Sequence, residues 1–185
     1  MSKVLLFICL TLIAVTGLCQ VNNELSEVEQ LVLDSRYEEA VRLIDSYLPK
    51  SRNATTLSIK KAEVLIRLGR LGDAELLLKQ VEETVSKEKN PLYYKALVAM
   101  DYGSLYQNQG RNDLAIEQFQ QAITYLDQDK RSANLESADA LAYLGNVYRS
   151  TGKYVQAEEQ LQRALAIRQA KLPENHELIA ASYND

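Results

Sequence analysis

The chain has 185 residues, of which 46% are hydrophobic and 25% are charged, a composition typical of a globular protein and not of a disordered one. Its formal net charge is -4, with acidic and basic residues interspersed, so the sequence offers no basic surface for nucleic acid or for an anionic membrane. The only two cysteines, Cys9 and Cys19, lie in an apolar N-terminal segment, which leaves none elsewhere for a disulfide framework or a structural zinc site.

The N-terminal segment has the anatomy of a secretory signal peptide. Lys3 precedes an apolar run at residues 4–15, and a less apolar stretch then leads to the polar Gln20. The apolar run has about a dozen residues, fewer than the roughly 20 of a membrane-spanning helix. We therefore expect residues 1–19 to be a signal peptide cleaved after Cys19, with export to the periplasm or the exterior of a bacterial cell. Two alternatives stay open: a lipoprotein anchored through Cys19, and a retained anchor or buried strand.

Helical periodicity begins directly after this segment. Apolar residues recur at helical spacing in residues 23–34 and again in residues 36–48, where Pro49 closes the second helix. A third helix is expected at about residues 53–68, stopped at Gly69, and a partner helix follows it. These segments predict two helical hairpins.

The second half of the chain repeats the hairpin pattern more clearly. Pro91 is suited to the first turn of a helix, where its missing N–H costs nothing. Residues 138–167 read as two amphipathic helices joined at Gly152, and Gly145 leaves room for a neighbouring helix. Residues 91–123 follow the same pattern around Gly110. We predict a protein without strands, with hairpin turns near Ser35, Gly69, Gly110 and Gly152.

The spacing of small residues confirms a repeat. Ala40 and Ala74 are 34 residues apart, Ala74 and Ala115 are 41, and Ala115 and Ala157 are 42. The pattern of large and small residues resembles the tetratricopeptide repeat, which it matches at Leu141, Leu144, Gly145, Tyr148, Ala157, Leu161 and Ala164. The longer period is similar to that of kinesin light chain, and residues 165–185 resemble the segment between repeats in that family. There Asn175 and His176 match, whereas Glu177 stands where that family has proline.

This resemblance implies an all-α fold, a right-handed superhelical solenoid of helix-turn-helix repeats over residues 20–185. The expected repeats are residues 21–54, 55–95, 96–137 and 138–179, approximately, with the start of a further repeat at 180–185. Because the chain enters that repeat and then stops, the apolar face around Leu161, Leu165 and Ile167 would be left partly open. We therefore expect the chain to be the N-terminal part of a longer protein or array.

The repeat geometry also implies a concave surface lined by the first helix of each repeat. Carried over to this sequence, the inward positions are Ile59, Glu63, Ile66, Leu97, Met100, Ser104, Gln107, Asp139, Ala142, Asn146, Arg149 and Asn184. The mixture of apolar and amide side chains suits an extended or helical peptide. Relatives that clamp a chaperone's C-terminal carboxylates use a cluster of Lys, Arg and Asn, which only Asn146 and Arg149 approach.

The sequence contains no convincing catalytic or metal-binding motif. His176 is the only histidine, and the resemblance already explains it structurally. No phosphate-binding loop follows a strand, and no nucleophile motif is present. We expect neither catalysis nor a cofactor or metal. Many of the 11 tyrosines fall on the large-residue sites of the repeat and are expected in the core, namely Tyr37, Tyr102, Tyr106, Tyr148 and Tyr154.

The favoured function is an exported scaffold that binds a protein or peptide through its concave groove. No nucleic acid is expected as a partner, and the membrane is involved only through the signal peptide or lipidation at Cys19. One alternative is the sensory or substrate-recruiting N-terminal part of a larger enzyme, such as a CHAT-type protease or a histidine kinase. The other is a purely structural spacer.

Overall fold

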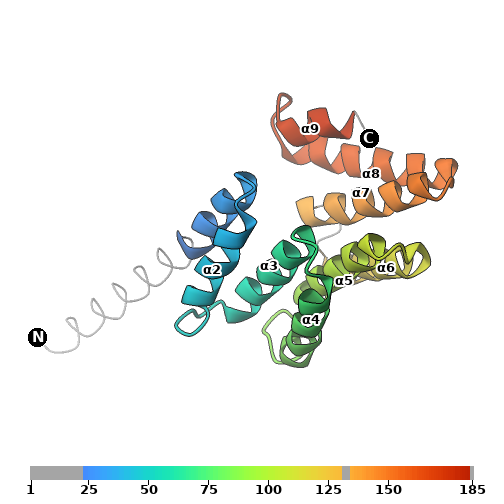
Figure 1. Cartoon of the computed structure of the whole chain (residues 1–185). Coiled ribbons are helices and arrows are strands. Elements are labelled where there is room, and N and C mark those ends of the chain that lie inside the picture. Colours follow the sequence, from blue (N-terminus) through green and yellow to red (C-terminus); the bar gives the residue numbers. More distant parts are fainter. Residues whose placement is uncertain (1–22, 131–133, 184–185) are drawn as a thin grey trace, which may run out of the picture.

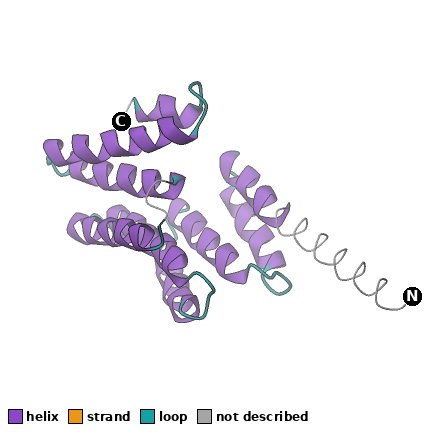
Figure 2. Cartoon of the chain, turned by 180° about the vertical axis from the view of Figure 1, so that it is seen from behind, coloured by secondary structure: helices purple, strands orange, loops and turns teal. Residues whose placement is uncertain are grey.

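The computed structural model describes residues 23–130 and 134–183, and within these residues every regular element is a helix (Figures 1 and 2). The predicted all-α solenoid is therefore confirmed. The signal-peptide prediction for residues 1–19 and the groove position Asn184 lie outside the described residues.

Successive helices pair into hairpins that stack along a curve (Figure 1). A helix at residues 23–33 precedes the labelled ones: α2 (Tyr37–Tyr47), α3 (Ala54–Arg67), α4 (Leu71–Val85), α5 (Pro91–Asn108), α6 (Asn112–Gln128), α7 (Leu135–Ser150), α8 (Tyr154–Lys171) and α9 (Glu177–Ser182). The hairpins of the 42-residue spacing have the longer helices, with 18 residues in α5 and in α8 against 11 in α2 and 14 in α3. The longer period thus lengthens the helices, as expected from about 3.6 residues per turn.

The hairpin turns lie where the sequence predicted them. Ser35, Gly69, Gly110 and Gly152 have φ values of 57°, 73°, 72° and 76°, the left-handed region that glycine adopts without strain. At each turn the next residue donates its backbone N–H to a carbonyl five residues earlier. These bonds are Arg36 to Leu31 (2.8 Å), Arg70 to Leu65 (2.9 Å), Arg111 to Tyr106 (2.8 Å) and Lys153 to Tyr148 (2.9 Å). This is the Schellman closure of a helix C-terminus, used at each of these turns.

Two helical glycines set the distance between the helices of the later hairpins. A Cβ atom on Gly103 of α5 would lie 2.6 Å from the Phe119 ring of α6. A Cβ atom on Gly145 of α7 would lie 2.7 Å from Leu161 Cγ of α8. Both distances are far below an ordinary carbon–carbon contact of about 3.5–4.0 Å. The predicted role of Gly145 in close helix packing is therefore confirmed.

The C-terminal end of the solenoid differs from one expectation. Tyr154 is 68% exposed and not in the core. The reason is its place in the stack: Tyr37, which also begins the second helix of a hairpin, packs against the following helices, whereas none of the described helices follows α8 at this end. The short helix α9 covers the other end of α8, and His176 caps α9 by accepting a hydrogen bond from the Leu178 N–H at 3.2 Å.

Candidate functional site

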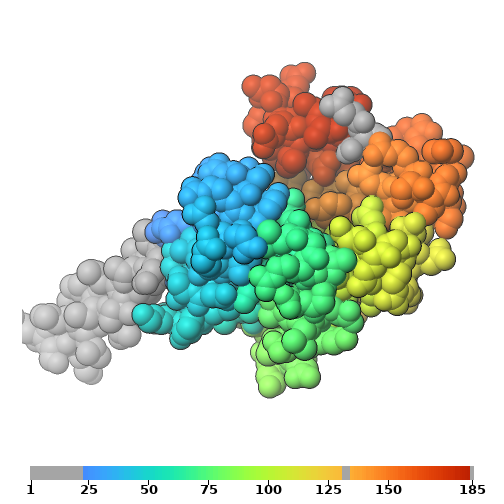
Figure 3. Space-filling view, in the orientation of Figure 1, coloured from blue at the N-terminus to red at the C-terminus, as the bar shows by residue number. Residues whose placement is uncertain are grey.

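A groove with a volume of about 810 Å³ runs across the first helices of the stacked hairpins. Its walls come from α3, α5 and the beginning of α7, with Leu25 and Glu29 of the N-terminal helix at one edge. In the space-filling view the surface is hollowed between the blue N-terminal helices and the orange and red C-terminal ones (Figure 3). The concave face thus has the position that the repeat pattern implied.

Most of the predicted groove residues lie together in this groove. They are Ile59, Glu63 and Ile66 of α3, Leu97, Met100, Ser104 and Gln107 of α5, and Asp139 of α7. Successive residues in this set are three or four apart along each helix, which places them on one face. The apolar members form a floor, and the polar members stand at intervals along it.

Three other predicted positions, Ala142, Asn146 and Arg149, lie outside the groove. Ala142 is only 5% exposed and packs with Leu141 and Ala164, because this part of α7 faces α8. Asn146 is not among the groove residues, and its Oδ1 atom is buried. Arg149 lines a separate hollow beside α8, near Tyr154. The part of α7 that follows Tyr143 therefore belongs to its own hairpin and not to the groove.

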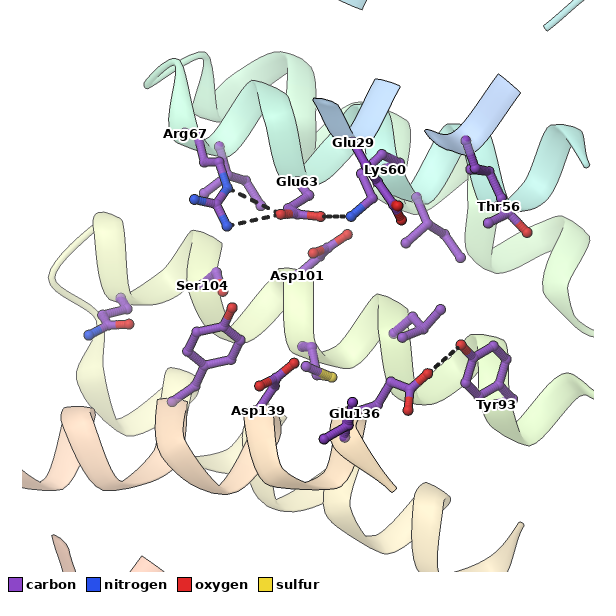
Figure 4. Close-up of a pocket in the computed structure, with 18 of the residues that line it drawn as sticks. Glu29, Thr56, Lys60, Glu63, Arg67, Tyr93, Asp101, Ser104, Glu136 and Asp139 are labelled. Atoms are coloured by element: carbon purple, nitrogen blue, oxygen red, sulfur yellow. Dashed lines mark hydrogen bonds and ion pairs between the residues drawn. The ribbon is translucent and has the colours of Figure 1, made fainter. Parts of the chain in front are cut away.

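An ion-pair network on α3 forms one wall. Glu63 accepts a hydrogen bond from Lys60 Nζ at 2.6 Å on one carboxylate oxygen, and its other oxygen contacts Arg67 at 3.0 Å (Figure 4). Burial acts to raise the pKa of Glu63, but the positive charges of Lys60 and Arg67 lower it overall. Glu63 therefore stays ionised, and both cations of this wall are engaged by it.

Asp101 of α5 faces this network from the opposite wall (Figure 4). Its side chain is almost fully buried, with 8% exposure, and its Oδ2 atom accepts no hydrogen bond from the residues that the structure describes. Burial raises the pKa of Asp101 well above its ordinary value, and the negative charge of Glu63 adds to this effect. Lys60 and Arg67 oppose the shift only in part. A buried carboxyl without a partner is rare and costly in a folded protein.

The acidic residues on the third wall are held by partners. Tyr93 donates its hydroxyl hydrogen to Glu136 at 2.9 Å (Figure 4). Arg168 of α8 contacts Asp139 at 2.8 Å. Tyr143 stands beside them; burial raises the pKa of its phenol, and the nearby charge of Asp139 raises it further. Across the groove the acidic side chains Glu29, Glu63, Asp101, Glu136 and Asp139 outnumber the cations Lys60 and Arg67.

Sequence reasoning missed Lys60, Arg67, Asp101 and Tyr143 as groove residues. It took one inward position per helical turn, whereas long side chains on the neighbouring positions also reach the groove. For Asp101 a signal was available, because it interrupts an otherwise apolar stretch at residues 96–102. An acidic residue in the buried face of a helix indicates a special environment.

Other kinds of site find no support in the described part of the chain. Within residues 23–130 and 134–183 no three His, Cys, Asp or Glu side chains are grouped closely enough to hold a metal ion. Over the same residues, none of the helices combines the length and the apolar character needed to cross a membrane.

Comparison with known proteins identifies the repeat. Residues 94–170 match the tetratricopeptide repeat family. This stretch consists of tetratricopeptide repeats. The tetratricopeptide fold of the chain is similar to BtubC (BKLC) from P. vanneervenii, with a TM-score of 0.66, 17% identity, and coverage of 85% of this chain and 63% of that one. The chain thus spans less than two thirds of that structure. A search of curated proteins found no match.

Two further structures share the tetratricopeptide architecture. A putative kinesin light chain with nearly identical repeats, from Podosopora anserina, has a TM-score of 0.57 and 20% identity, covering 88% of this chain and 82% of that one. MamA from Desulfovibrio magneticus RS-1 has a TM-score of 0.54 and 16% identity, covering 83% and 78%. At these identities the likeness concerns the fold. The predicted tetratricopeptide repeat is confirmed for residues 94–170, and the likeness to the kinesin light chain structure is one of fold.

Proposed function

We propose that this protein is a non-catalytic scaffold that binds a segment of another protein in the groove along α3, α5 and α7. The tetratricopeptide fold supports a protein-interaction scaffold. The observation that carries the finer proposal is the groove itself, whose volume of about 810 Å³ falls in the range of about 300–1,000 Å³ typical of ligand sites.

The composition of the groove suits a peptide more than a compact small molecule. Its floor is apolar through Ile59, Leu97 and Met100, and polar side chains such as Ser104 and Gln107 follow along its length. An extended chain can place apolar side chains on such a floor and its backbone amides against the polar groups.

A matched pair of bulky substitutions tests the groove. The probe is a phage-displayed library of random dodecapeptides, followed by fluorescence polarisation with the selected peptides made synthetically. Ser104→Trp fills the groove and should weaken binding at least about tenfold, a loss of 1.4 kcal/mol. Ser46→Trp makes the same change at an exposed site on α2 outside the groove and should leave affinity unchanged. Selected peptides that bind Ser104→Trp as tightly as the wild type would refute the groove as the site.

We further propose that the protein is exported, with the scaffold acting in the periplasm or outside the cell. The support is the signal-peptide pattern at residues 1–19. Mass spectrometry of the protein expressed in a bacterial host tests this directly. A mature chain that begins at Gln20 is expected, whereas a diacylglyceryl group on Cys19 would establish the lipoprotein form, and an intact Met1 would refute processing.

A further inference from the structure

The carboxyl group of Asp101 lies buried in the groove without a hydrogen-bond donor among the described residues. Asp101 is almost completely buried, and its Oδ2 atom accepts no hydrogen bond from any described residue. The other acidic side chains deep in the groove are engaged: Glu63 by two cations and Asp139 by Arg168. A buried acceptor left without a donor costs about 1–3 kcal/mol, so its retention inside a binding groove points to a donor supplied by the ligand.

We propose that the groove receives the ammonium or guanidinium group of a lysine or arginine side chain from its peptide ligand, with Asp101 as the direct acceptor and Glu63 beside it. This inference rests on the proposed peptide-binding function and specifies what that site recognises.

The charge balance of the groove favours a cation over an anion. The groove cations Lys60 and Arg67 both contact Glu63, at 2.6 Å and 3.0 Å, so each already has a carboxylate partner. An anionic ligand would therefore meet a surface with excess carboxylates and no unengaged cation among the described groove residues. A divalent metal ion is also disfavoured, because the described residues provide no group of three suitable ligands.

The surroundings of Asp101 fit the shape of a long basic side chain. Met100 and Leu97 of α5 and Ile59 of α3 line the approach to it with apolar surface. Lysine and arginine pack their methylene stems along such surface while the charged head reaches a polar group. The groove therefore offers contacts to both parts of the side chain.

Proton binding gives the proposal a second signature. Burial raises the pKa of Asp101, so the empty groove favours the neutral acid, whereas a cationic ligand favours the carboxylate. Affinity should increase as the pH rises through the pKa of Asp101 and then level off. The other groups that face Asp101 are Glu63, Lys60 and Arg67 from α3 and Tyr143 from α7. Glu63 has a lowered pKa and Tyr143 a raised one, so neither should titrate in the same range.

The experiment is a double-mutant cycle on a peptide selected from the dodecapeptide library. We expect the selected clones to share a lysine or arginine. Replacing that residue by norleucine removes its charge and should weaken binding to the wild type at least tenfold at pH 7.5. The loss should fall below twofold with Asp101→Asn. The matched control Asp113→Asn, an exposed change on α6 outside the groove, should retain the tenfold loss.

The result can fail in distinguishable ways. Clones without a shared basic residue that still lose affinity with Ser104→Trp would overturn the cation site and leave the peptide groove intact. An additive cycle, with the same norleucine loss in wild type and Asp101→Asn, would also overturn it. Selected peptides whose affinity is unchanged by Ser104→Trp would overturn both proposals. Spermidine binding as tightly as the peptide, and with the same dependence on Asp101, would mean a free amine and not a peptide.

A second measurement covers the case in which Asp101→Asn does not fold. The affinities of the basic peptide and of its norleucine form are then compared on the wild-type protein between pH 5 and pH 8. The basic peptide should bind more tightly as the pH rises, and the norleucine form should not. Equal pH profiles for the two peptides would overturn the proposal.

Discussion

Replacing each helical glycine by alanine should destabilise the protein at two positions and stabilise it at a third. Gly103 and Gly145 face the partner helix of their hairpins, where a Cβ atom would lie 2.6 Å from Phe119 and 2.7 Å from Leu161. Gly72, in the first turn of α4, has no such neighbour within 4 Å. The same chemical change therefore meets packed and open surroundings in one molecule.

The magnitude follows from two opposing effects. Alanine is favoured over glycine in a helix by about 1 kcal/mol. At Gly145 the Leu161 side chain would have to retreat by about 1 Å to reach ordinary contact distance, and overpacking of this kind costs about 1–3 kcal/mol. The carbonyl oxygen of Ala157 lies 3.3 Å from the same Cβ position and limits relief by helix movement. We expect Gly145→Ala and Gly103→Ala to lose up to about 2 kcal/mol, and Gly72→Ala to gain up to about 1 kcal/mol.

Urea unfolding followed by circular dichroism measures these differences. Leu161→Ala tests whether the clash causes the loss of stability, because it removes the Leu161 Cγ atom that the new Cβ atom of Gly145→Ala would contact. The pair should be more stable than the sum of the single changes by at least 0.5 kcal/mol, roughly the lower bound for residues in contact. Leu76→Ala, at an exposed leucine on α4, should show no such coupling with Gly145→Ala. Equal stability of the three alanine variants would contradict the packing argument.

Three further outcomes are expected. The pKa of Asp101 is raised in the native state, so the native protein holds a proton that the unfolded chain releases above a pH of about 4. The wild type should therefore lose stability relative to Asp101→Asn as the pH rises. Urea melts should show a difference of about 1.4 kcal/mol for each unit by which the pKa is raised. Gly110→Ala should cost about 1–2 kcal/mol in the same assay, since its φ of 72° is strained for alanine even though the space is open. Arg168→Met should cost about 1–2 kcal/mol and speed hydrogen exchange in α9, because it removes contacts to Asp139 at 2.8 Å and Ser182 at 2.6 Å.

Turns and helix ends could be predicted from the sequence because they depend on residues at or next to those positions. The turn at Gly110 needs a positive φ, which glycine signals directly, and Pro91 marks the first residue of α5. The groove positions on α3 and α5 follow from the resemblance to the tetratricopeptide repeat, whose geometry says which helical face is concave. Ala142 could not be placed this way, because its burial depends on where α8 lies across α7.

The interactions inside the groove could be predicted from the sequence less well than the position of the groove. Whether Lys60 points toward Glu63 or toward solvent is decided by rotamers and by the charges on the opposite helix, which sequence spacing does not specify. The same holds for Asp101, which lacks a hydrogen-bond partner among the described residues only because of how α3 and α5 face each other. Tyr154 shows the converse case, since its environment depends on packing beyond its own hairpin, and it is exposed among the helices that the structure describes.

The contacts between the helices should allow the width of the groove to change at a low cost in free energy. The α3–α4 hairpin packs on the α5–α6 hairpin, which packs on α7 mainly through α6, while α3 and α7 face each other across the groove without extensive contact of their own. A small rotation at each of the two interfaces therefore adds up at the groove edges, yet leaves every hairpin and its Schellman turn intact. We expect such bending of the stack to cost less free energy than unfolding any one hairpin. For a ligand bound between α3 and α7, the free energy of bending the stack would be part of the binding free energy. A longer array would bend further under the same force.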